Sequence, residues 1–381
     1  MREELAPLFE PFTNGSLTTA NRFVMSPMTR NFSPDGVPSP EVADYYARRA
    51  HMGLVITEGV GPDHPSALGD GTTGGPALPL MYGEAALASW KSVVDKVHAA
   101  GGKIAPQLWH MGAIRLAGTG PHPEAPSISP SGIWGPFDKA MLPPEYLEAV
   151  KVPGKPASES DIADMIAGFA RSAAYAHELG FDAIALHGGH GYMLDAFLWE
   201  LTNQRSDQWG GDALKRTRFA CEVVKAVRQV IPADKPIIYR FSQWKLQDYA
   251  AKLAQTPDEL GVITGALADA GVDIFDVSTR HFDAPAFEGS NMGLSGWVRK
   301  VTGKPVMTVG GIGFDKDLQS SFMETTTPID NLGEVVRRFE AGEFDLVAIG
   351  RACLMDADWI GKARRGEPFN PFDLSALGRL D

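Results

Sequence analysis

The chain has 381 residues, of which 44% are hydrophobic and 22% charged, the balance of a globular protein with a substantial core. Its 35 basic and 47 acidic side chains give a net charge of −12, so neither a nucleic acid nor a membrane surface is expected as a partner. The two cysteines, Cys221 and Cys353, are too few for a disulfide framework, a cysteine zinc site or an iron–sulfur cluster. The acidic N-terminus is unlike a signal peptide and no apolar run is long enough to span a membrane, so we expect a cytoplasmic protein.

Eight short apolar runs alternate with longer amphipathic segments along the chain. Each run is rich in Val, Ile and Leu and is bounded by Gly, Pro or polar residues, which is typical of a buried parallel strand. The runs are 22–29, 54–59, 103–109, 183–187, 236–242, 274–279, 305–310 and 346–350.

The segments between the runs have the ends of helices. The segment 161–179 stops at Gly180, and another starts at Thr256 with a proline and two acids before ending near Gly271. Similar patterns cover 84–100, 214–230 and 332–340. We therefore predict an α/β protein, a (β/α)₈ TIM barrel whose single domain is the whole chain, 1–381. A doubly wound sheet is the alternative, but no G-x-G-x-x-G follows the first strand.

Two connections are too long for simple loops. They cover 60–82, which is rich in Gly and Pro, and 111–160, which contains many prolines. Long loops in a compact domain are usually functional. Because both follow strands, we expect them to cap the C-terminal face, where barrel enzymes keep their active sites.

The last two strands end in glycine. Gly310 and Gly311 follow the seventh, and Gly350 and Arg351 follow the eighth. Such loops commonly bind phosphate in barrels, through backbone N–H groups and a cation. Glycine at a strand end is also ordinary turn chemistry, but the position of Arg351 favours a phosphate.

The fourth strand ends in His187, followed by His190 and Tyr192. The pair could be structural, or could bind a metal, but suitable Asp or Cys ligands are missing nearby, and we predict no metal site. We favour a clamp in which two imidazoles donate N–H bonds to a substrate oxygen while Tyr192 supplies a proton.

Arg240 ends an otherwise apolar strand. A buried arginine needs a partner, so we expect an anion or an electron-rich ring beside it, the alternative being an ion pair with Glu58 or Asp276. Gln107 and Trp109 end the third strand and could be core residues, although a glutamine there suits an amide-bearing ring.

Taken together, the motifs resemble the Old Yellow Enzyme family of FMN-dependent ene-reductases. The matching stretches are RFVMSPMTR (22–30), ITEG (56–59), QLWH (107–110), HGGHGYMLDAFL (187–198), LTNQRSDQWGG (201–211), TVGGIG (308–313) and AIGRACLMDADW (348–359). They occur in family order over nearly the whole chain. Residues 241–245, FSQWK, depart from the common pattern and mark a subgroup.

The resemblance implies an FMN across the mouth of the barrel, reduced by NADPH or NADH. Ten residues are implied to bind it: Pro27, Met28, Thr29, Gly59, Gln107, Arg240, Gly310, Gly311, Gly350 and Arg351. Among them Thr29 would bond a flavin carbonyl, Gln107 the pyrimidine edge, and Arg240 would stabilise negative charge on the reduced ring.

The resemblance also implies how a small-molecule substrate is held. His187 and His190 would grip the oxygen of an activated alkene, Tyr192 would protonate the α-carbon, and Trp109 and Phe287 would line the pocket. The expected activity is NAD(P)H-dependent reduction of α,β-unsaturated carbonyl compounds, and of nitroalkenes, by a monomer or homodimer.

Three alternatives remain. The same flavin site would serve nitrate esters, other nitro compounds or oxygen. A non-catalytic flavin-binding barrel would be expected to lack Tyr192 or the histidines, which are present. A flavin-free lyase would need a lysine or paired carboxylates at the strand ends, which offer no lysine.

Overall fold

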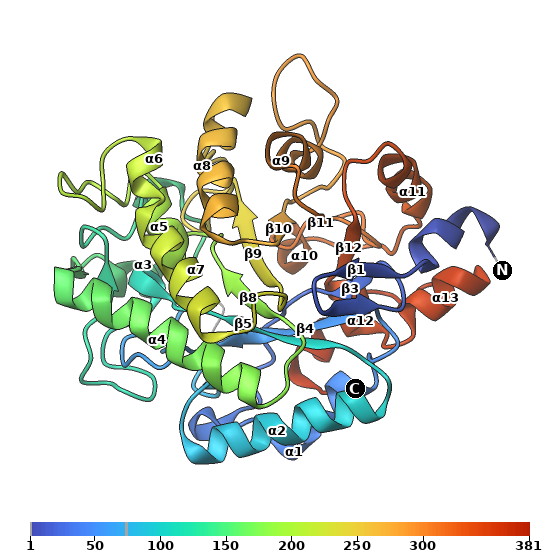
Figure 1. Ribbon diagram of the computed structural model, residues 1–381, viewed down its shortest axis with the longest axis horizontal. Coiled ribbons are helices and arrows are strands. Elements are labelled where there is room, and N and C mark those ends of the chain that lie inside the picture. The colour runs from blue at the N-terminus through green and yellow to red at the C-terminus, as the bar shows by residue number, and fades with distance from the viewer. Residues whose placement is uncertain (1, 73–74) are drawn as a thin grey trace.

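Eight parallel strands form a closed barrel at the centre of the computed structural model, which describes residues 2–72 and 75–381 (Figure 1). They follow one another in chain order, and the last pairs with the first, since Val347 lies opposite Phe23. The strands are β3 (Phe23–Met25), β4 (Leu54–Val60), β5 (Ile104–Leu108), β8 (Ile184–His187), β9 (Ile237–Ser242), β10 (Ile274–Ser278), β11 (Val306–Val309) and β12 (Leu346–Ile349). Each lies in a predicted run, β4 extending one residue further, and the predicted (β/α)₈ barrel is confirmed.

Helices connect the strands and cover the outside of the barrel. The Ser158 hydroxyl caps α4 (Glu159–Glu178), and the Thr256 hydroxyl caps α8 (Pro257–Ala270). The other helices of the outer layer are α1 (Pro40–Ala47), α2 (Glu84–Ala99), α7 (Arg218–Val230), α9 (Leu294–Thr302), α11 (Leu332–Glu340), α12 (Arg351–Met355) and α13 (Trp359–Arg365). None of the helices in the described part of the chain has both the length and the apolar composition needed to span a bilayer.

The helix predicted over 214–230 is interrupted, so its prediction as one continuous element is wrong. A short α6 (Ala213–Arg216) ends at Thr217, and α7 begins at the next residue. The Thr217 hydroxyl donates to the Leu214 carbonyl at 2.6 Å. Such a bond offers the backbone an alternative to the regular helix, which hydrophobic periodicity does not reveal.

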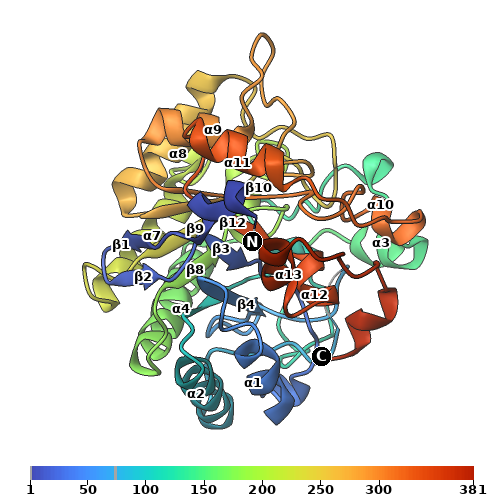
Figure 2. The ribbon, with the colours of Figure 1, turned by 90° about the vertical axis from the view of Figure 1, so that its right-hand side faces the viewer.

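A short antiparallel hairpin, β1 (Phe12–Asn14) and β2 (Leu17–Thr19), closes the N-terminal end of the barrel. Phe12 and Leu17 are buried in one apolar cluster with the strand residues Val24 and Ile274. The hairpin lies on the left of Figure 2, whereas α3 (Pro144–Val150) and α10 (Ser320–Met323) lie on the right, at the opposite end. Side chains therefore fill this end, and the functional groups at the strand termini meet at the other.

The connection over 111–160, here called the cap, folds into small elements. They are η3 (Gly112–Ile114), β6 (Ile128–Ser129), η4 (Phe137–Lys139), α3 (Pro144–Val150) and β7 (Lys155–Pro156). β6 pairs with β7, and cap residues share an apolar cluster with Trp109 and Tyr192. The connection over 60–82 contributes Leu68 and Leu78 to this cluster; its residues 73 and 74 lie outside the described residues.

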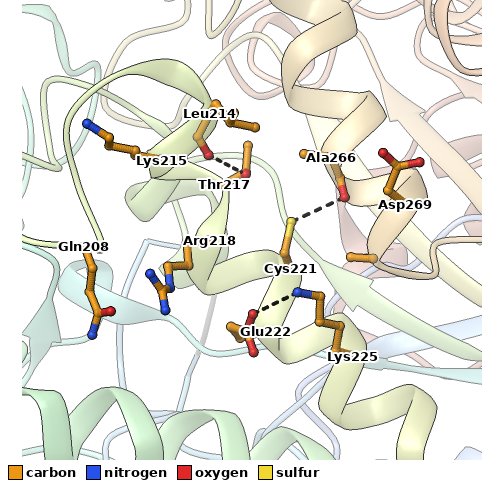
Figure 3. Close-up of a pocket in the computed structure, with 11 residues that line it drawn as sticks. Gln208, Leu214, Lys215, Thr217, Arg218, Cys221, Glu222, Lys225, Ala266 and Asp269 are labelled. Carbon is orange, nitrogen blue, oxygen red and sulfur yellow. Dashed lines mark hydrogen bonds and ion pairs between the residues drawn. The ribbon is translucent and has the colours of Figure 1, made fainter.

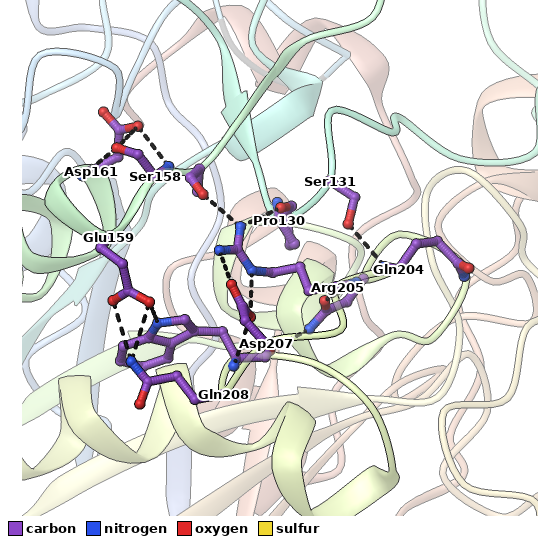
Figure 4. A network of polar contacts seen from close by, with 12 residues as sticks. Pro130, Ser131, Ser158, Glu159, Asp161, Gln204, Arg205, Asp207 and Gln208 are labelled. Atoms are coloured by element: carbon purple, nitrogen blue, oxygen red, sulfur yellow. Dashed lines mark hydrogen bonds and ion pairs between the residues drawn. The ribbon is translucent and has the colours of Figure 1, made fainter.

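Arg205 joins the cap to the segment that follows α5 (Met193–Leu198) (Figure 4). Its guanidinium donates to the carbonyls of Pro130 at 2.9 Å and Ala157 at 2.5 Å, which directly follow β6 and β7. Asp207 accepts from the same guanidinium at 2.6 Å and 3.0 Å. One side chain therefore holds both cap strands, which gives the LTNQRSDQWGG stretch a structural role.

Candidate active site

The barrel opens at the carboxyl ends of its strands. The strand bodies are buried, whereas Pro27, Met28 and Thr29 after β3 are half-buried, and so are Gly310 and Gly311 after β11. Gly350 after β12 is half-buried too, and β12 pairs with both β11 and β3, so the three loops are neighbours. Small residues and accessible backbone form a surface on which a flat, phosphate-bearing ligand can lie.

Four aromatic side chains gather at this mouth. The His187 ring lies 4.8 Å from Tyr192 and 4.9 Å from His190, measured between ring centroids. Trp109 lies edge-on to Tyr192 at 5.0 Å and stacks near His187 at 6.4 Å. The structure thus brings together four of the five residues predicted to contact the substrate.

His187 is buried and His190 half-buried, neither has a carboxylate partner among the described residues, and both are therefore neutral near pH 7. Burial is the main cause that lowers the pKa of His187 and of His190 well below the ordinary value, and the Arg240 cation adds to it. The Gly189 N–H donates to His187 Nδ1 at 3.4 Å, which leaves the proton of that ring on Nε2. His190 Nε2 lies 2.8 Å from Ser278 Oγ. Two neutral imidazoles can donate N–H bonds to one oxygen without introducing charge.

Arg240 is 6% exposed and is paired with Asp276. Its guanidinium lies 2.7 Å from Asp276 Oδ2 and donates to Ser26 Oγ at 2.9 Å. Of the two ion pairs considered from the sequence, the one with Asp276 exists. Asp276 Oδ1 is buried without a hydrogen-bond partner among the described residues. The pair fixes the guanidinium at the mouth, one strand away from His187, since Arg240 and His187 are paired residues of β9 and β8.

Glu58 is not paired with Arg240. Its Oε2 accepts the backbone N–H groups of Arg30 at 2.8 Å and Asn31 at 3.1 Å. Burial raises the pKa of Glu58 to about 7. The residue therefore holds the turn that presents Thr29, a role that sequence reasoning did not assign.

Gln107 offers a buried donor to a flavin ring, beside Gly59 and Trp109. Gln107 is 3% exposed, and its side-chain Nε2 has no hydrogen-bond partner among the described residues. A buried amide left unbonded costs free energy, so an external acceptor is expected at this position. A Cβ at Gly59 would lie 2.4 Å from Trp109 Cε3, so this position has no room for a side chain. The unpartnered amide of Gln107 thus matches the polar edge of a flavin, whereas the glycine at position 59 is required by the packing of Trp109.

Arg351 lies at the mouth, but other groups occupy its donors. Its guanidinium donates to the carbonyls of Lys316 at 2.6 Å and Asp317 at 3.1 Å, and also to Ser321 Oγ. The participation of Arg351 in a phosphate site therefore stays a prediction. The same holds for the strand-end glycines Gly310, Gly311 and Gly350.

Phe287 makes its aromatic contact outside the histidine cluster. It is 7% exposed and packs edge-on against Trp297 of α9 at 5.6 Å. Its assignment as a pocket wall stays a prediction.

A cleft of about 490 Å³ lies elsewhere, on the outside of the barrel between α6, α7 and α8 (Figure 3). Cys221 lines it and donates weakly to the Ala266 carbonyl at 3.5 Å, while Lys225 and Glu222 form an ion pair at 3.0 Å. None of the predicted site residues lines this cleft. The functional groups converge at the mouth, so we place the site there.

Sequence reasoning missed two charged residues beside the mouth, Lys245 and Asp195. Both side chains are fully buried, and they form an ion pair. The signal was present: Asp195 interrupts the apolar stretch of α5, and Lys245 belongs to the unusual FSQWK stretch.

Comparison with known proteins identifies the family of the chain. The model of the NADH:flavin oxidoreductase / NADH oxidase family matches residues 7–370. The 12-oxophytodienoate reductase 7 of Oryza sativa subsp. japonica is 30% identical, over 97% of this chain and 91% of its own length. An NADH oxidase of Thermoanaerobacter brockii is 30% identical over 94% of this chain, which corresponds to 51% of that protein. The solved structure of morphinone reductase in complex with tetrahydroNAD has a TM-score of 0.78 and 26% identity, covering 97% of this chain and 93% of that one.

The barrel, its mouth and these matches define an FMN-dependent oxidoreductase that takes its electrons from a nicotinamide. The chain belongs to the NADH:flavin oxidoreductase / NADH oxidase family, and the resemblance of its motifs to Old Yellow Enzyme is thereby confirmed.

Proposed function

We propose that this protein reduces the C=C bond of electron-poor alkenes, chiefly α,β-unsaturated carbonyl compounds and also nitroalkenes. The observation that carries the proposal is the cluster of His187, His190 and Tyr192, in which the rings of His190 and Tyr192 each lie within 5 Å of the His187 ring, measured between centroids. Reduction of such an alkene needs donors for one oxygen and a proton for one carbon. The cluster contains both.

FMN, when bound, would supply the hydride, which originates from NADPH or NADH. Gln107 would bond the pyrimidine edge through its unpartnered Nε2, and Thr29 a ring carbonyl. Arg240, held by Asp276, would place positive charge beside the reduced ring. Pro27, Met28 and Gly59 would line the ring, and Gly310, Gly311, Gly350 and Arg351 would surround the phosphate.

The protein's own groups then activate the alkene. His187 and His190 donate N–H bonds to the carbonyl or nitro oxygen and withdraw electron density, so the β-carbon becomes the acceptor of hydride. Tyr192 gives its proton to the α-carbon. Trp109 and Phe287 form walls of the pocket, and the cap limits the entry of water.

Several relatives support a carbonyl-bearing substrate by name, among them the 12-oxophytodienoate reductase. The similarity to an NADH oxidase favours a second candidate, in which oxygen is the main acceptor. Nitrate esters and other nitro compounds would use the same oxygen clamp.

The test is an anaerobic titration of the purified holoenzyme, monitored through its visible absorption. NADPH or NADH should bleach the flavin band, and cyclohexenone should restore it. A flavin that bleaches and is restored by oxygen or a nitrate ester but not by the enone would favour the second candidate. A protein that neither contains nor binds FMN would refute both.

A further inference from the structure

An ion pair without access to solvent lies beside the histidine–tyrosine cluster. Lys245 Nζ is 2.6 Å and 2.7 Å from the two carboxylate oxygens of Asp195, and both side chains are fully buried. Asp195 belongs to α5, whose N-cap residue is Tyr192, while Lys245 follows β9. The cost of removing two charges from water offsets most of their mutual attraction, so a buried ion pair contributes little to the stability of the fold. The pair is therefore better explained by the part of the backbone that it holds in place.

The turn that carries the cluster has a strained backbone. His190 has a φ of +65° and Gly191 a φ of +84°, so two consecutive residues are in the left-handed region. Glycine adopts this conformation freely, but a histidine does not. The surrounding structure has to hold the turn in this shape.

The segment 242–247 holds His190 on three sides. The His190 N–H donates to Ser242 Oγ at 2.8 Å, and its carbonyl accepts from the Leu246 N–H at 3.2 Å. The ring of Trp244 stacks on the His190 ring with centroids 4.2 Å apart. Lys245 itself pairs with His190 in an isolated parallel β-bridge.

The ion pair holds the next residue, Gly191. The Gly191 N–H donates to Asp195 Oδ2 at 2.7 Å, so the carboxylate that binds Lys245 also binds the backbone immediately before Tyr192. Gln247 packs against the other side, since a Cβ at Gly191 would lie 2.0 Å from Gln247 Oε1. Lys245 also donates to the Ser242 carbonyl at 3.2 Å, which ties the segment to the pair.

We propose that Lys245 is a positioning residue: through Asp195 it holds the Gly189–Tyr192 turn in its left-handed shape and so sets the distance between the oxygen clamp and the proton donor. The proposal rests on the proposed function, because it assigns to the turn the roles given there to His190 and Tyr192. It predicts that loss of the Lys245–Asp195 pair impairs two functions together. These are the binding of the substrate's oxygen atom by the histidines and proton transfer from Tyr192.

The rival explanation is that the pair only stabilises the fold. Two variants separate these possibilities. Lys245→Met leaves a buried carboxylate without its cation, which should lower stability and loosen the turn. Lys245→Met with Asp195→Leu removes both charges and should recover much of the stability, but it leaves the Gly191 N–H without its acceptor. A purely structural pair predicts that function recovers with stability; a positioning pair predicts that it does not.

The experiment compares the FMN-loaded wild type with both variants and with Arg338→Met. Arg338 is a matched control because it is 5% exposed and paired with Glu334 and Glu343 on the outside of the barrel. The first readout is the dissociation constant of 4-hydroxybenzaldehyde, a phenolate ligand for the oxygen clamp, from the oxidised enzyme. It is measured through the change in flavin absorption. The second is the division between kcat and KM for cyclohexenone, with the melting temperature measured alongside.

We expect the phenolate dissociation constant to rise about tenfold and kcat for the enone to fall by about 10²-fold in both Lys245 variants, since small misplacements of reacting groups have effects of this size. Arg338→Met should change both values less than twofold despite a lower melting temperature. Recovery of phenolate binding and kcat in the double variant would overturn the proposal, and so would an unchanged Lys245→Met.

Phenolate binding also distinguishes this proposal from the proposed function. If the wild type fails to reduce the enone but binds the phenolate, the alkene reaction is wrong while the phenolate comparison among variants still decides the role of Lys245. If the wild type binds no phenolate, the oxygen clamp is wrong, and the positioning role falls with it.

Discussion

Replacement of Tyr192 by phenylalanine should separate the two half-reactions. The Tyr192 ring is 3% exposed and makes edge contacts with His187 at 4.8 Å and Trp109 at 5.0 Å. Phenylalanine keeps this ring but removes the proton. Loss of a positioned proton donor lowers a rate by roughly 10²–10⁴-fold, equivalent to ~3–5 kcal/mol of activation free energy. We expect about 10³-fold, because the apolar cap cluster around Tyr192 leaves little room for water to replace the phenol.

The assay is anaerobic stopped-flow absorption at the flavin band. Flavin reduction by NADPH should stay within about threefold of the wild-type rate, because no proton from Tyr192 is required in that step. Reoxidation by cyclohexenone should show the loss described above. The FMN content of each preparation is measured to normalise the rates.

Tyr146→Phe provides a matched control from the same apolar cluster. The Tyr146 hydroxyl donates to the Ile114 carbonyl at 2.8 Å and is remote in sequence from the strand ends. This variant should lose about 1 kcal/mol of stability and keep both half-reactions. The assignment of Tyr192 as proton donor would be refuted by an equal loss in both half-reactions of Tyr192→Phe, or by full alkene reduction.

Three further predictions concern the site and the barrel. Gln107→Leu should weaken FMN binding by ~1–3 kcal/mol, about 5- to 150-fold, because the flavin edge loses its buried donor; fluorescence titration of the apoprotein with FMN measures this, and unchanged affinity would contradict the assignment. Burial raises the pKa of Glu58 from 4.5 to about 7, so the folded protein retains a proton that the unfolded chain releases, and stability falls as the pH rises through that interval. Glu58→Gln should therefore match the wild type near pH 4.5 and exceed its free energy of unfolding by up to ~3 kcal/mol at pH 8, as urea denaturation would reveal; equal stability at both pH values would speak against the raised pKa. Gly59→Ala should lower stability by ~1–3 kcal/mol and FMN content with it, because its Cβ meets Trp109 at 2.4 Å; Gly265→Ala in α8, where a Cβ has no neighbour within 4 Å, should stabilise slightly, and similar melting temperatures for the two variants would exclude the steric explanation.

The barrel was readable from the sequence because its strands are buried on both sides. A strand between barrel interior and helices is apolar throughout, so all eight stand out as short runs. The ends of α4 and α8 were also readable, since Ser158 and Thr256 act locally on the first helical turn. The break at Thr217 was not, because a threonine inside an amphipathic pattern is compatible with either a continuous helix or a bend.

The candidate site was predicted in part for the same reason. Residues at strand ends reach the mouth whatever the loops do, which is why His187, Trp109 and Arg240 were found. The choice of Asp276 over Glu58 as partner of Arg240 depends on strand register: Asp276 lies directly opposite Arg240 in the neighbouring strand. The link from Lys245 to Asp195 joins two connections of the barrel, and spacing along the chain carries no information about such a contact.

The Arg205 contacts have a consequence for altering the substrate range of this protein. The cap strands β6 and β7 are bound through Arg205 to the segment after α5, and Asn203 in that segment donates to the Phe197 carbonyl of α5 at 2.7 Å. The helix whose N-cap residue is Tyr192, the proposed proton donor, is thus joined to the cap by a short chain of bonds. Widening the cap to admit a bulkier molecule would strain the same chain of bonds, so we expect a change in selectivity to alter turnover as well. Libraries that randomise the cap are best built with Asn203 and Arg205 kept, and with Asp207 unchanged beside them.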